Sequence, residues 1–442
     1  MAVARDHFTN CGASISSGTA NTITSSTGNC LLVFAAMTNS GVISSVVDSK
    51  SNPYALVAKT TNGSTIFVEV WMAKAATTGV TSVTVTFSGG GTAQILVYDL
   101  SGADANNPLG ATAILDGTAY SATNLVGPRV GHPGSNGIVI SWGHFNAAPS
   151  AVGGGFTGDL LNTNNAAAYQ TFSTGGSFTP SWTFGTSGLG VVSMIILPVA
   201  NTYFTNIRTI QQQNSGLGSA LTTAGLVTQA GDLVVLAAGA DSGHGVATPY
   251  TDNQSGNTYN MVTGMNPISS PDSVVFVGYG VLVNGANSHT FTFNHTSNGG
   301  NAMQVIVVTP LTGTPTYHTS NTGTVSPSNT AHAAATATVA ANDFLVAGIS
   351  AGYTTITSLT ANGSWLLSIP EKTQMDGNTY EPGLTEFQLS AAGGSTHDDF
   401  TTAPATTSCD FIVAFSPAIT GPAQFLIPGD MTPGSNVVWE VA

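Results

Sequence analysis

Charge is the scarcest property of this sequence. Only 6% of its 442 residues are Asp, Glu, Lys or Arg, against about 25% in ordinary soluble domains. The seven basic residues are scattered, the net charge is −14, and no Lys or Arg stands between Arg208 and Lys372. A nucleic-acid groove needs clustered cations, and an anionic membrane surface attracts them too. Nucleic acid and membranes are therefore disfavoured as partners.

Long apolar runs are also missing. No stretch approaches the roughly 20 consecutive apolar residues of a membrane-spanning helix. Residues 1–10 contain neither the apolar region nor the cleavage site of a secretory signal. We therefore expect a protein that is made and used without this form of export. The alternative is a trimmed signal and an extracellular or cell-surface location.

Cysteine is rare, with three residues at positions 11, 30 and 409. Cys11 and Cys30 fall in predicted neighbouring strands, so a disulfide between them is geometrically possible. The alternative is that all three cysteines are small buried apolar side chains. Cys409 has no evident partner.

Arrangements of catalytic or metal-binding residues are absent. The nine histidines form no His-Glu-x-x-His frame, and there is no Cys-x-x-Cys pair. The densest acidic patch is His397, Asp398 and Asp399, preceded by Glu381 and Glu386. Paired carboxylates can bind Ca²⁺ or hydrolyse glycosides, but adjacent residues of an extended strand point to opposite faces. We predict no catalytic residue, no cofactor and no metal.

What the sequence does contain is a repeated apolar strand. Similar runs occupy residues 30–36, 137–143, 232–238 and 343–348, and each follows a turn of small residues. A run of about six apolar residues between turn formers is typical of a strand in a β-sandwich core. The spacing is roughly one small domain, longer than the 20–50 residues or so of solenoid repeats. The pattern favours tandem β-sandwiches.

We therefore predict an all-β fold of tandem antiparallel β-sandwich domains, Ig-like or jelly-roll-like, with almost no helix. The predicted domains are residues 5–112, a diverged copy at 113–200, then 201–313 and 314–420, followed by an extended tail at 421–442. The tail ends in a strand-like apolar run that either folds back or joins a sheet edge elsewhere. The candidate assembly residues in that run are Val437, Val438, Trp439 and Val441.

Two kinds of aspartate recur at equivalent places. Asp48 and Asp252 each precede a stretch rich in Ser, Asn and Gly. One carboxylate is too few for a Ca²⁺ loop, so an Asx-turn is the better interpretation. Asp232 and Asp343 precede the repeated strand as turn acceptors, and we expect Cys30 to replace that aspartate in the first copy.

The tryptophans divide into two groups. Trp71, Trp142 and Trp182 lie within predicted strands, which favours core packing. Trp365 and Trp439 are better candidates for an exposed sugar-binding surface.

The order of these motifs resembles a β-sandwich repeat of bacteriophage virion proteins, namely minor tail, fibre and head-decoration proteins. The resemblance is carried by residues 231–235, 251–259, 289–293 and 303–308, and by their equivalents in the first copy. It implies a displayed structural or binding role, with no family catalytic residues to carry over. Bacterial surface adhesins use a similar order of strands.

The leading hypothesis is a non-enzymatic structural protein of a phage virion, assembled in the host cytoplasm as part of a tail, fibre or capsid decoration. Its partners would be other copies of itself, other virion proteins and, at one end, a host-surface glycan. The low charge supports assembly because it removes repulsion between subunits. The alternative is a secreted or surface adhesin or carbohydrate-binding protein. A third hypothesis, a β-sandwich hydrolase, requires Glu381, Glu386 or Asp399 to share one cleft.

Overall fold

The computed structural model consists of β-strands, and the residues it describes contain no helix, which confirms the predicted all-β class. Accordingly, no described segment is a helix long and apolar enough to cross a membrane. The structure describes residues 2–418 except 15–16, 22–24, 27, 39–41, 63–65, 89–91, 116–123, 128, 133–134, 146, 161–164, 185–190, 197–202, 215–219, 242–249, 263–272, 295–300, 334–335, 352–357, 362–365, 368–382, 389–391 and 397–398. The predicted tail and its assembly residues Val437, Val438, Trp439 and Val441 lie outside the described residues.

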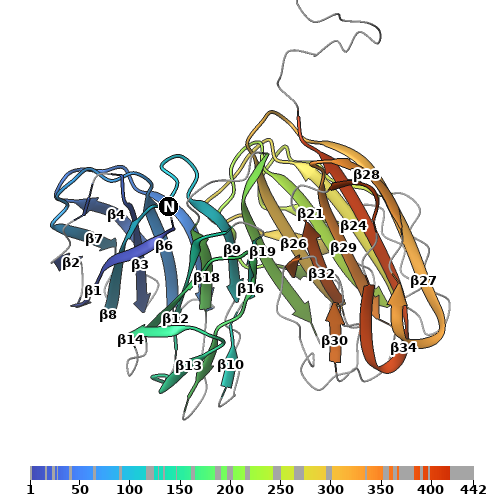
Figure 1. The fold of residues 1–442 in the computed structure, drawn as a ribbon, viewed down its shortest axis with the longest axis horizontal. Helices are drawn as coiled ribbons and strands as arrows, with labels where there is room; N and C mark the ends of the chain where they lie inside the picture. Colours follow the sequence, from blue (N-terminus) through green and yellow to red (C-terminus); the bar gives the residue numbers. More distant parts are fainter. Residues whose placement is uncertain are drawn as a thin grey trace, which may run out of the picture.

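The strands group into four units, which we number by chain order (Figure 1). Each unit has a large sheet and one or two small sheets. The large sheet of unit 1 runs in the order β1 (Ala4–Ser14), β8 (Thr92–Ser101), β3 (Cys30–Thr38), β6 (Ile66–Ala73), β5 (Ala55–Asn62). Its small sheet is β2 (Ser17–Asn21), β7 (Ser82–Ser88), β4 (Val42–Asp48).

Unit 2 has a large sheet and two small ones. The large-sheet order is β9 (Leu109–Leu115), β18 (Val191–Ile196), β12 (Gly137–His144), β15 (Asn165–Phe172), β14 (Thr157–Leu160). The first small sheet is β10 (Asn124–Val126), β17 (Ser181–Thr183), β13 (Ala151–Gly153), and the second is β11 (Val130–His132), β16 (Gly176–Phe178).

Units 3 and 4 follow the same plan. In unit 3 the large-sheet order is β19 (Phe204–Asn214), β26 (Asn301–Pro310), β21 (Leu233–Asp241), β24 (Ser273–Val281), β23 (Asn260–Met261), and the small sheet is β20 (Ala220–Thr222), β25 (Phe291–Asn294), β22 (Tyr250–Asp252). In unit 4 the large-sheet order is β27 (Thr316–Ala333), β34 (Asp399–Ser416), β29 (Phe344–Ala351), β32 (Gly383–Gln388), β31 (Leu366–Leu367), with β30 (Ser358–Ala361) also paired to β34, and the small sheet is β28 (Ala337–Ala341), β33 (Ala392–Thr396).

One strand order therefore recurs in all four units. The first strand of the unit pairs with its last strand, and the last pairs with the repeated apolar strand predicted from the sequence, which is β3, β12, β21 or β29. The limits of the four predicted domains stay predictions. The strand β9 begins at Leu109, ahead of the predicted limit at residue 112.

Units 2 and 3 share a single ten-stranded sheet. Their first strands, β9 and β19, pair in parallel, with Ile207 opposite Ala111 and Thr209 opposite Ala113. The strand order is mirrored on the two sides of this pair. Parallel strands in mirrored order correspond to a rotation by half a turn about an axis along the strands. The two halves of the sheet therefore present equivalent faces on opposite sides.

Neighbouring units also pack face to face through their large sheets. Between units 1 and 2, the rings of Phe34 and Trp142 lie 5.5 Å apart, and both side chains are fully buried. Between units 3 and 4, the rings of Phe204 and Phe344 lie 5.5 Å apart and are buried as well. Burying each such side chain contributes about 1.5–3 kcal/mol. Along the chain the units are joined by a face, then an edge, then a face.

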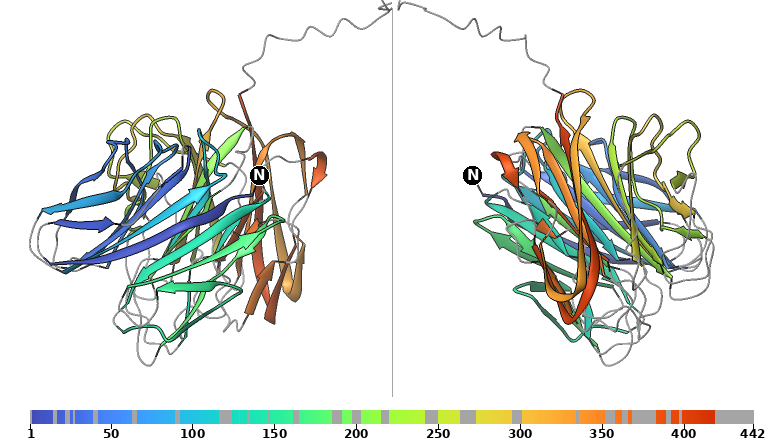
Figure 2. Two further views of the ribbon diagram at one scale, coloured as in Figure 1. Left: turned by 60° about the vertical axis from the view of Figure 1, so that its left-hand side comes forward. Right: turned by 90° about the vertical axis from the view of Figure 1, so that its right-hand side faces the viewer.

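The opposite face of each large sheet covers the small sheets of its own unit. In β3, Leu31 and Val33 face the small sheet, whereas Leu32 and Phe34 face unit 2. This follows from the alternation of side chains along a strand. Such a strand is buried on both faces, which is why the repeated motif is continuously apolar rather than alternating. Figure 2 shows the resulting layers from two further sides.

Candidate functional site

The repeated strand is entered through the same tight turn in units 1, 3 and 4. The residue before the last turn position has a positive φ, namely Gly28 (84°), Gly231 (89°) and Asn342 (70°). The next residue then donates its backbone N–H to the carbonyl three positions earlier, at 3.3 Å for Asn29, 3.2 Å for Asp232 and 3.3 Å for Asp343. Gly and Asn are the residues that adopt this left-handed conformation at little cost.

In unit 3 this turn delivers a fully buried carboxylate, Asp232, to the junction of three strands. The Arg208 guanidinium of β19 lies 2.9 Å from Asp232 Oδ2, and the Thr309 hydroxyl of β26 donates to Oδ1 at 2.7 Å. The backbone N–H of Gln229 also donates to Oδ2, at 2.8 Å. Asp232 thus connects the first strand, the last strand and the turn.

Unit 4 builds the same connection with different donors. Asp343 is fully buried, and its Oδ2 lies 2.6 Å from His318 Nδ1 of β27. Ser416 of β34 donates to Oδ1 at 2.7 Å, and the backbone N–H of Ala340 donates to Oδ2 at 2.9 Å. Arg208 and His318 therefore serve the same purpose on equivalent strands.

Unit 1 reverses the chemistry of the pair. Asn29 occupies the position of Asp232 and donates to Asp99 Oδ1 at 2.7 Å, so the carboxylate now comes from the last strand, β8. His7 of β1 lies 2.9 Å from Asp99 Oδ2. The expectation that Cys30 replaces the aspartate is therefore wrong by one residue, because Cys30 is already the first residue of β3. We call each of these three clusters a latch.

A β-bulge aims the first-strand partner of each latch. The register of the first strand shifts between Arg5 and His7, between Thr205 and Arg208, and between Tyr317 and Thr319. A bulge redirects a side chain that would otherwise follow the alternation of the strand. Residues of the first strand thereby reach a carboxylate in the interior of the unit.

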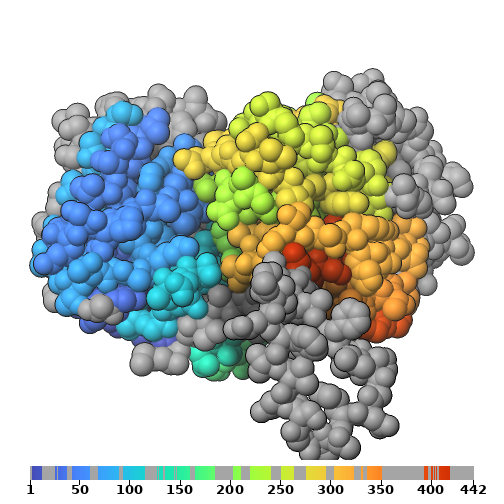
Figure 3. All heavy atoms as spheres, turned by 90° about the horizontal axis from the view of Figure 1, so that it is seen from above, coloured from blue at the N-terminus to red at the C-terminus, as the bar shows by residue number. Residues whose placement is uncertain are grey.

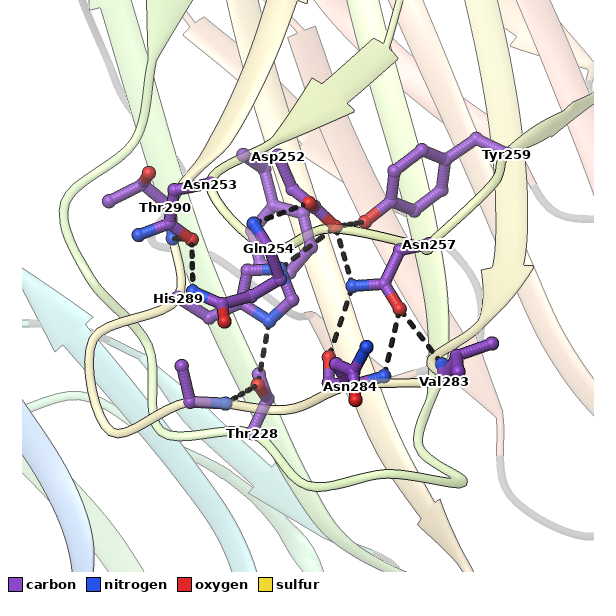
Figure 4. Close-up of polar contacts among 12 residues, drawn as sticks. Thr228, Asp252, Asn253, Gln254, Asn257, Tyr259, Val283, Asn284, His289 and Thr290 are labelled. Atoms are coloured by element: carbon purple, nitrogen blue, oxygen red, sulfur yellow. Dashed lines mark hydrogen bonds and ion pairs between the residues drawn. The ribbon is translucent and has the colours of Figure 1, made fainter.

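A second polar cluster surrounds Asp252 at the end of β22 (Figure 4). Its Oδ1 accepts the backbone N–H of Gln254 at 2.8 Å, which confirms the predicted Asx-turn. Its Oδ2 accepts from Asn257 Nδ2 at 2.8 Å and from the Tyr259 hydroxyl. Burial alone would raise the Asp252 pKa, but the hydrogen bonds from Tyr259, Asn257, Gln254 and His289 hold that pKa below its usual range.

The same Asx-turn is present in unit 1. Asp48 Oδ1 accepts the backbone N–H of Lys50 at 2.8 Å, and Oδ2 accepts from Asn52 Nδ2 at 2.8 Å and from the Tyr54 hydroxyl at 3.0 Å. In both units the amide oxygen of the asparagine accepts from the loop opposite, at Thr77 in unit 1 and at Val283 and Asn284 in unit 3. The turn therefore holds two loops together.

In unit 3 the cluster also contains a carboxylate, an imidazole and a hydroxyl in line. His289 Nε2 lies 3.0 Å from Asp252 Oδ2, and His289 Nδ1 lies 2.7 Å from the Thr228 hydroxyl. Burial lowers the His289 pKa and the Asp252 carboxylate opposes that shift, so we assign a neutral ring. The contacts then favour a proton on Nε2, facing Asp252, with Thr228 donating to Nδ1.

In hydrolases, a hydroxyl, an imidazole and a carboxylate in this order act as nucleophile, base and orienting group. Here the three groups are buried, whereas an active site must be open to its substrate. His289 is fully buried and Thr228 is 6% exposed. The Thr228 hydroxyl also accepts the backbone N–H of Ala286 at 3.1 Å. In unit 1 the loops close without an imidazole, since Ser25 Oγ accepts from the Val80 backbone N–H at 3.1 Å, as the Thr228 hydroxyl accepts from Ala286. The arrangement therefore joins loops rather than presenting a nucleophile.

The predicted site residues are not brought together. Cys11 and Cys30 are free thiols. The prediction that their strands are neighbours is wrong, because β8 lies between β1 and β3. Cys11 stands opposite Ile95 and Cys30 opposite Leu100, and the two side chains pack in cores on opposite faces of the sheet. No disulfide can span that separation.

The acidic residues weighed for calcium binding or hydrolysis fall mainly outside the described residues, as do Trp365 and Trp439. Glu381, His397 and Asp398 are among them. The backbone of Glu386 lies opposite Ala347, which pairs near one end of β34, whereas Asp399 begins that strand at the other end. Within the described part of the chain, no group of three His, Cys, Asp or Glu residues is placed to hold a metal ion.

The remaining predicted residues are the three tryptophans assigned to the core. Trp142 and Trp182 are fully buried, as predicted, and Trp71 is half-buried with its indole donating to Glu69 at 3.0 Å. The latch partners His7, Arg208 and His318 were missed. A usable signal exists, since each precedes the turn residue of its unit by a similar stretch of chain.

Comparison with known proteins adds no assignment. No known protein-family model matches this sequence, and no curated protein is significantly similar to it.

Proposed function

We propose that this chain is a non-enzymatic structural protein of a bacteriophage virion, in a tail, a fibre or a capsid decoration. The observation that supports it best is the fourfold recurrence of one strand order in units that are joined by buried faces and by a shared sheet. Buried carboxylates in the three latches bind strands together instead of facing a cleft. These features suit a rigid body that works through its outer edges.

The partners under this proposal are other copies of the chain and other virion proteins. Because 6% of the residues are charged, few charged side chains would lose their hydration at an interface between copies. A host-surface glycan at one end of the particle is a further proposed partner. The alternative role, a secreted adhesin or carbohydrate-binding protein, would need a row of exposed aromatic rings. Tyr317 is the exposed aromatic among the described residues, and its ring stacks on Tyr279 at 5.2 Å instead of standing free.

The test is to locate the protein on particles. Antibodies raised against the purified chain would be applied to phage particles from a culture that produces it, and bound antibody would be imaged with gold labels by electron microscopy. We expect labels at a repeated position on the tail or head. Particles without label, with the protein found instead in the host cell envelope or the medium, would contradict the proposal and direct work to a glycan-binding screen.

A further inference from the structure

The outer edges of β1 and β27 correspond to the strand edges that pair between units 2 and 3. The first strands of units 2 and 3, β9 and β19, pair with each other. The first strands of units 1 and 4, β1 and β27, hold the same position in their sheets and end them. Among the described residues, no strand pairs with the outer edge of either.

These two edges lie at opposite ends of the long axis. β1 is at the left of Figure 1 and β27 at the far right. The right-hand view of Figure 2 looks onto the C-terminal end, where β27 and β34 are nearest the viewer. Figure 3, seen from above, again shows the N-terminal unit in blue at one end and the C-terminal unit in orange towards the other. Copies that meet through these edges would lie end to end.

Neither edge projects a lysine, and although each edge strand has a β-bulge near its start, β19 has one too and still pairs with β9. Proteins protect edges with projecting lysines, prolines or short strands. The charged side chains of β1 turn back to their own molecule: Arg5 pairs with Asp159, Asp6 accepts from Ser101 at 2.7 Å, and His7 contacts Asp99. The strand β27 contains no Lys, Arg, Asp or Glu, and its proline, Pro327, lies beyond the stretch 316–325.

The sequence of joins along the chain indicates the partner. Units 1 and 2 meet by a face, units 2 and 3 by an edge, and units 3 and 4 by a face. We propose that an edge follows next, with β27 of one copy pairing in parallel with β1 of a second copy. This would build a second ten-stranded sheet, between molecules, in the form of the one inside the chain.

The internal join also predicts the register. His7 matches Arg208, since each lies opposite the last-strand residue that pairs with the second residue of the repeated strand. Ser320 matches Thr112 through the third position of the repeated strand, counted from Phe344 in unit 4 and from Ile138 in unit 2: Val346 pairs with Val413 opposite Ser320, and Ile140 pairs with Met194 opposite Thr112. Because Arg208 lies opposite Thr112 in the chain, His7 would lie opposite Ser320 of the neighbouring copy.

Such a contact joins two different surfaces, so it propagates from copy to copy into a closed ring or an open filament. This inference rests on the proposed function, since it names the surface through which copies of a structural protein would meet. Main-chain hydrogen bonds along the added strand would provide the affinity.

The test uses one lysine on each edge, because a projecting lysine opposes strand pairing. Asn10 in β1 and Asn321 in β27 are both exposed; Asn321 lies within the predicted three-residue register, and Asn10 lies on the same edge two positions beyond it. We expect wild-type protein to assemble, and N10K and N321K each to sediment as a 44.6 kDa monomer. An equal mixture of the two variants should form a dimer of twice that mass, because each variant keeps the edge that the other has lost.

The control is T78K, which adds the same charge at an exposed loop position between β6 and β7 and should assemble like wild type. Equal thermal midpoints would show that the variants are folded. Either variant assembling alone as wild type does would overturn the edge inference and leave the proposed function standing. Wild-type protein that stays monomeric at every concentration would overturn the inference and count against the structural role as well.

Discussion

Asp410 is a buried carboxyl group in β34 whose surroundings do not compensate its charge. It is 1% exposed, Ser408 donates to its Oδ1 at 3.1 Å, and its Oδ2 has no hydrogen-bond partner among the described residues. Burial raises the Asp410 pKa to about 7, although the Ser408 hydrogen bond opposes the shift. At a pH between 3.8, the ordinary pKa of an aspartate, and about 7, the folded state keeps a proton on Asp410 that the unfolded chain has lost. Stability contributed by Asp410 is therefore present at pH 4 and lost as the pH rises through 7.

The variant D410N isolates this effect. At pH 8 we expect it to be more stable than wild type by about 2–4 kcal/mol, because the amide never has to be buried as an anion. At pH 4 the two proteins should be nearly equal. Urea unfolding at both pH values measures the difference, and all other titrating groups cancel between the two proteins. A stability difference that does not change with pH would contradict the assigned pKa.

His289 shows how much one position can vary within a conserved loop. It contacts Asp252 and Thr228, whereas the corresponding loop of unit 1 contains no histidine and keeps its Asx-turn. The turn depends on the aspartate, the asparagine and the tyrosine, which appear in both units. The imidazole adds its two contacts, with Asp252 and Thr228, to a cluster that closes without it in unit 1.

At the scale of the element, the latch of unit 3 is the clearest case of a strand position fixed by charge. Arg208 is 2% exposed and Asp232 is fully buried, so each group compensates the charge of the other. We expect R208M to destabilise the protein by about 3–5 kcal/mol, because it leaves an unpaired buried carboxylate. Urea unfolding at neutral pH measures the loss.

The double variant R208M/D232N is the control for that prediction. It removes both charges and should recover much of the loss, since a buried ion pair is often replaceable by neutral groups at small cost. Additive losses in the double-mutant cycle would show that the two residues act independently and that the latch is not a unit.

The elements also show what the sequence could and could not predict. Apolar runs after small-residue turns placed β3, β12, β21 and β29 correctly, because a strand buried on both faces has an unmistakable composition. The long strand β27 was missed, since its Thr, Ser and Asn content is that of a loop and pairing with β34 makes it a strand, whereas β34 was predicted over its apolar part alone, residues 409–415. The latch contacts and the parallel β9–β19 pair join residues far apart in the chain. No local pattern encodes such a register.

At the scale of the molecule, the interiors of units 2 and 3 are continuous with the faces that join them to units 1 and 4, whereas the space between the two sheets of unit 1 and that of unit 4 each form a smaller core. One core runs from Phe34 in unit 1 through Trp142 in unit 2 to Phe293 in unit 3. A second runs from Trp182 in unit 2 through Val235 in unit 3 to Phe411 in unit 4. Each middle unit thus belongs to both cores. A chain of independent domains would have four cores that do not touch.

Continuous cores predict cooperative unfolding of the whole chain. We expect scanning calorimetry of wild-type protein to show one transition whose calorimetric and van't Hoff enthalpies agree, as in a single domain. The variant W142A removes a fully buried ring from the face between units 1 and 2, which should cost about 3–5 kcal/mol. Because it weakens one join and spares the other two, it should split off a low-temperature transition for unit 1. Several resolved transitions in the wild type would instead mean that the shared sheet and the two cores transmit little stability between units, and that each unit folds on its own.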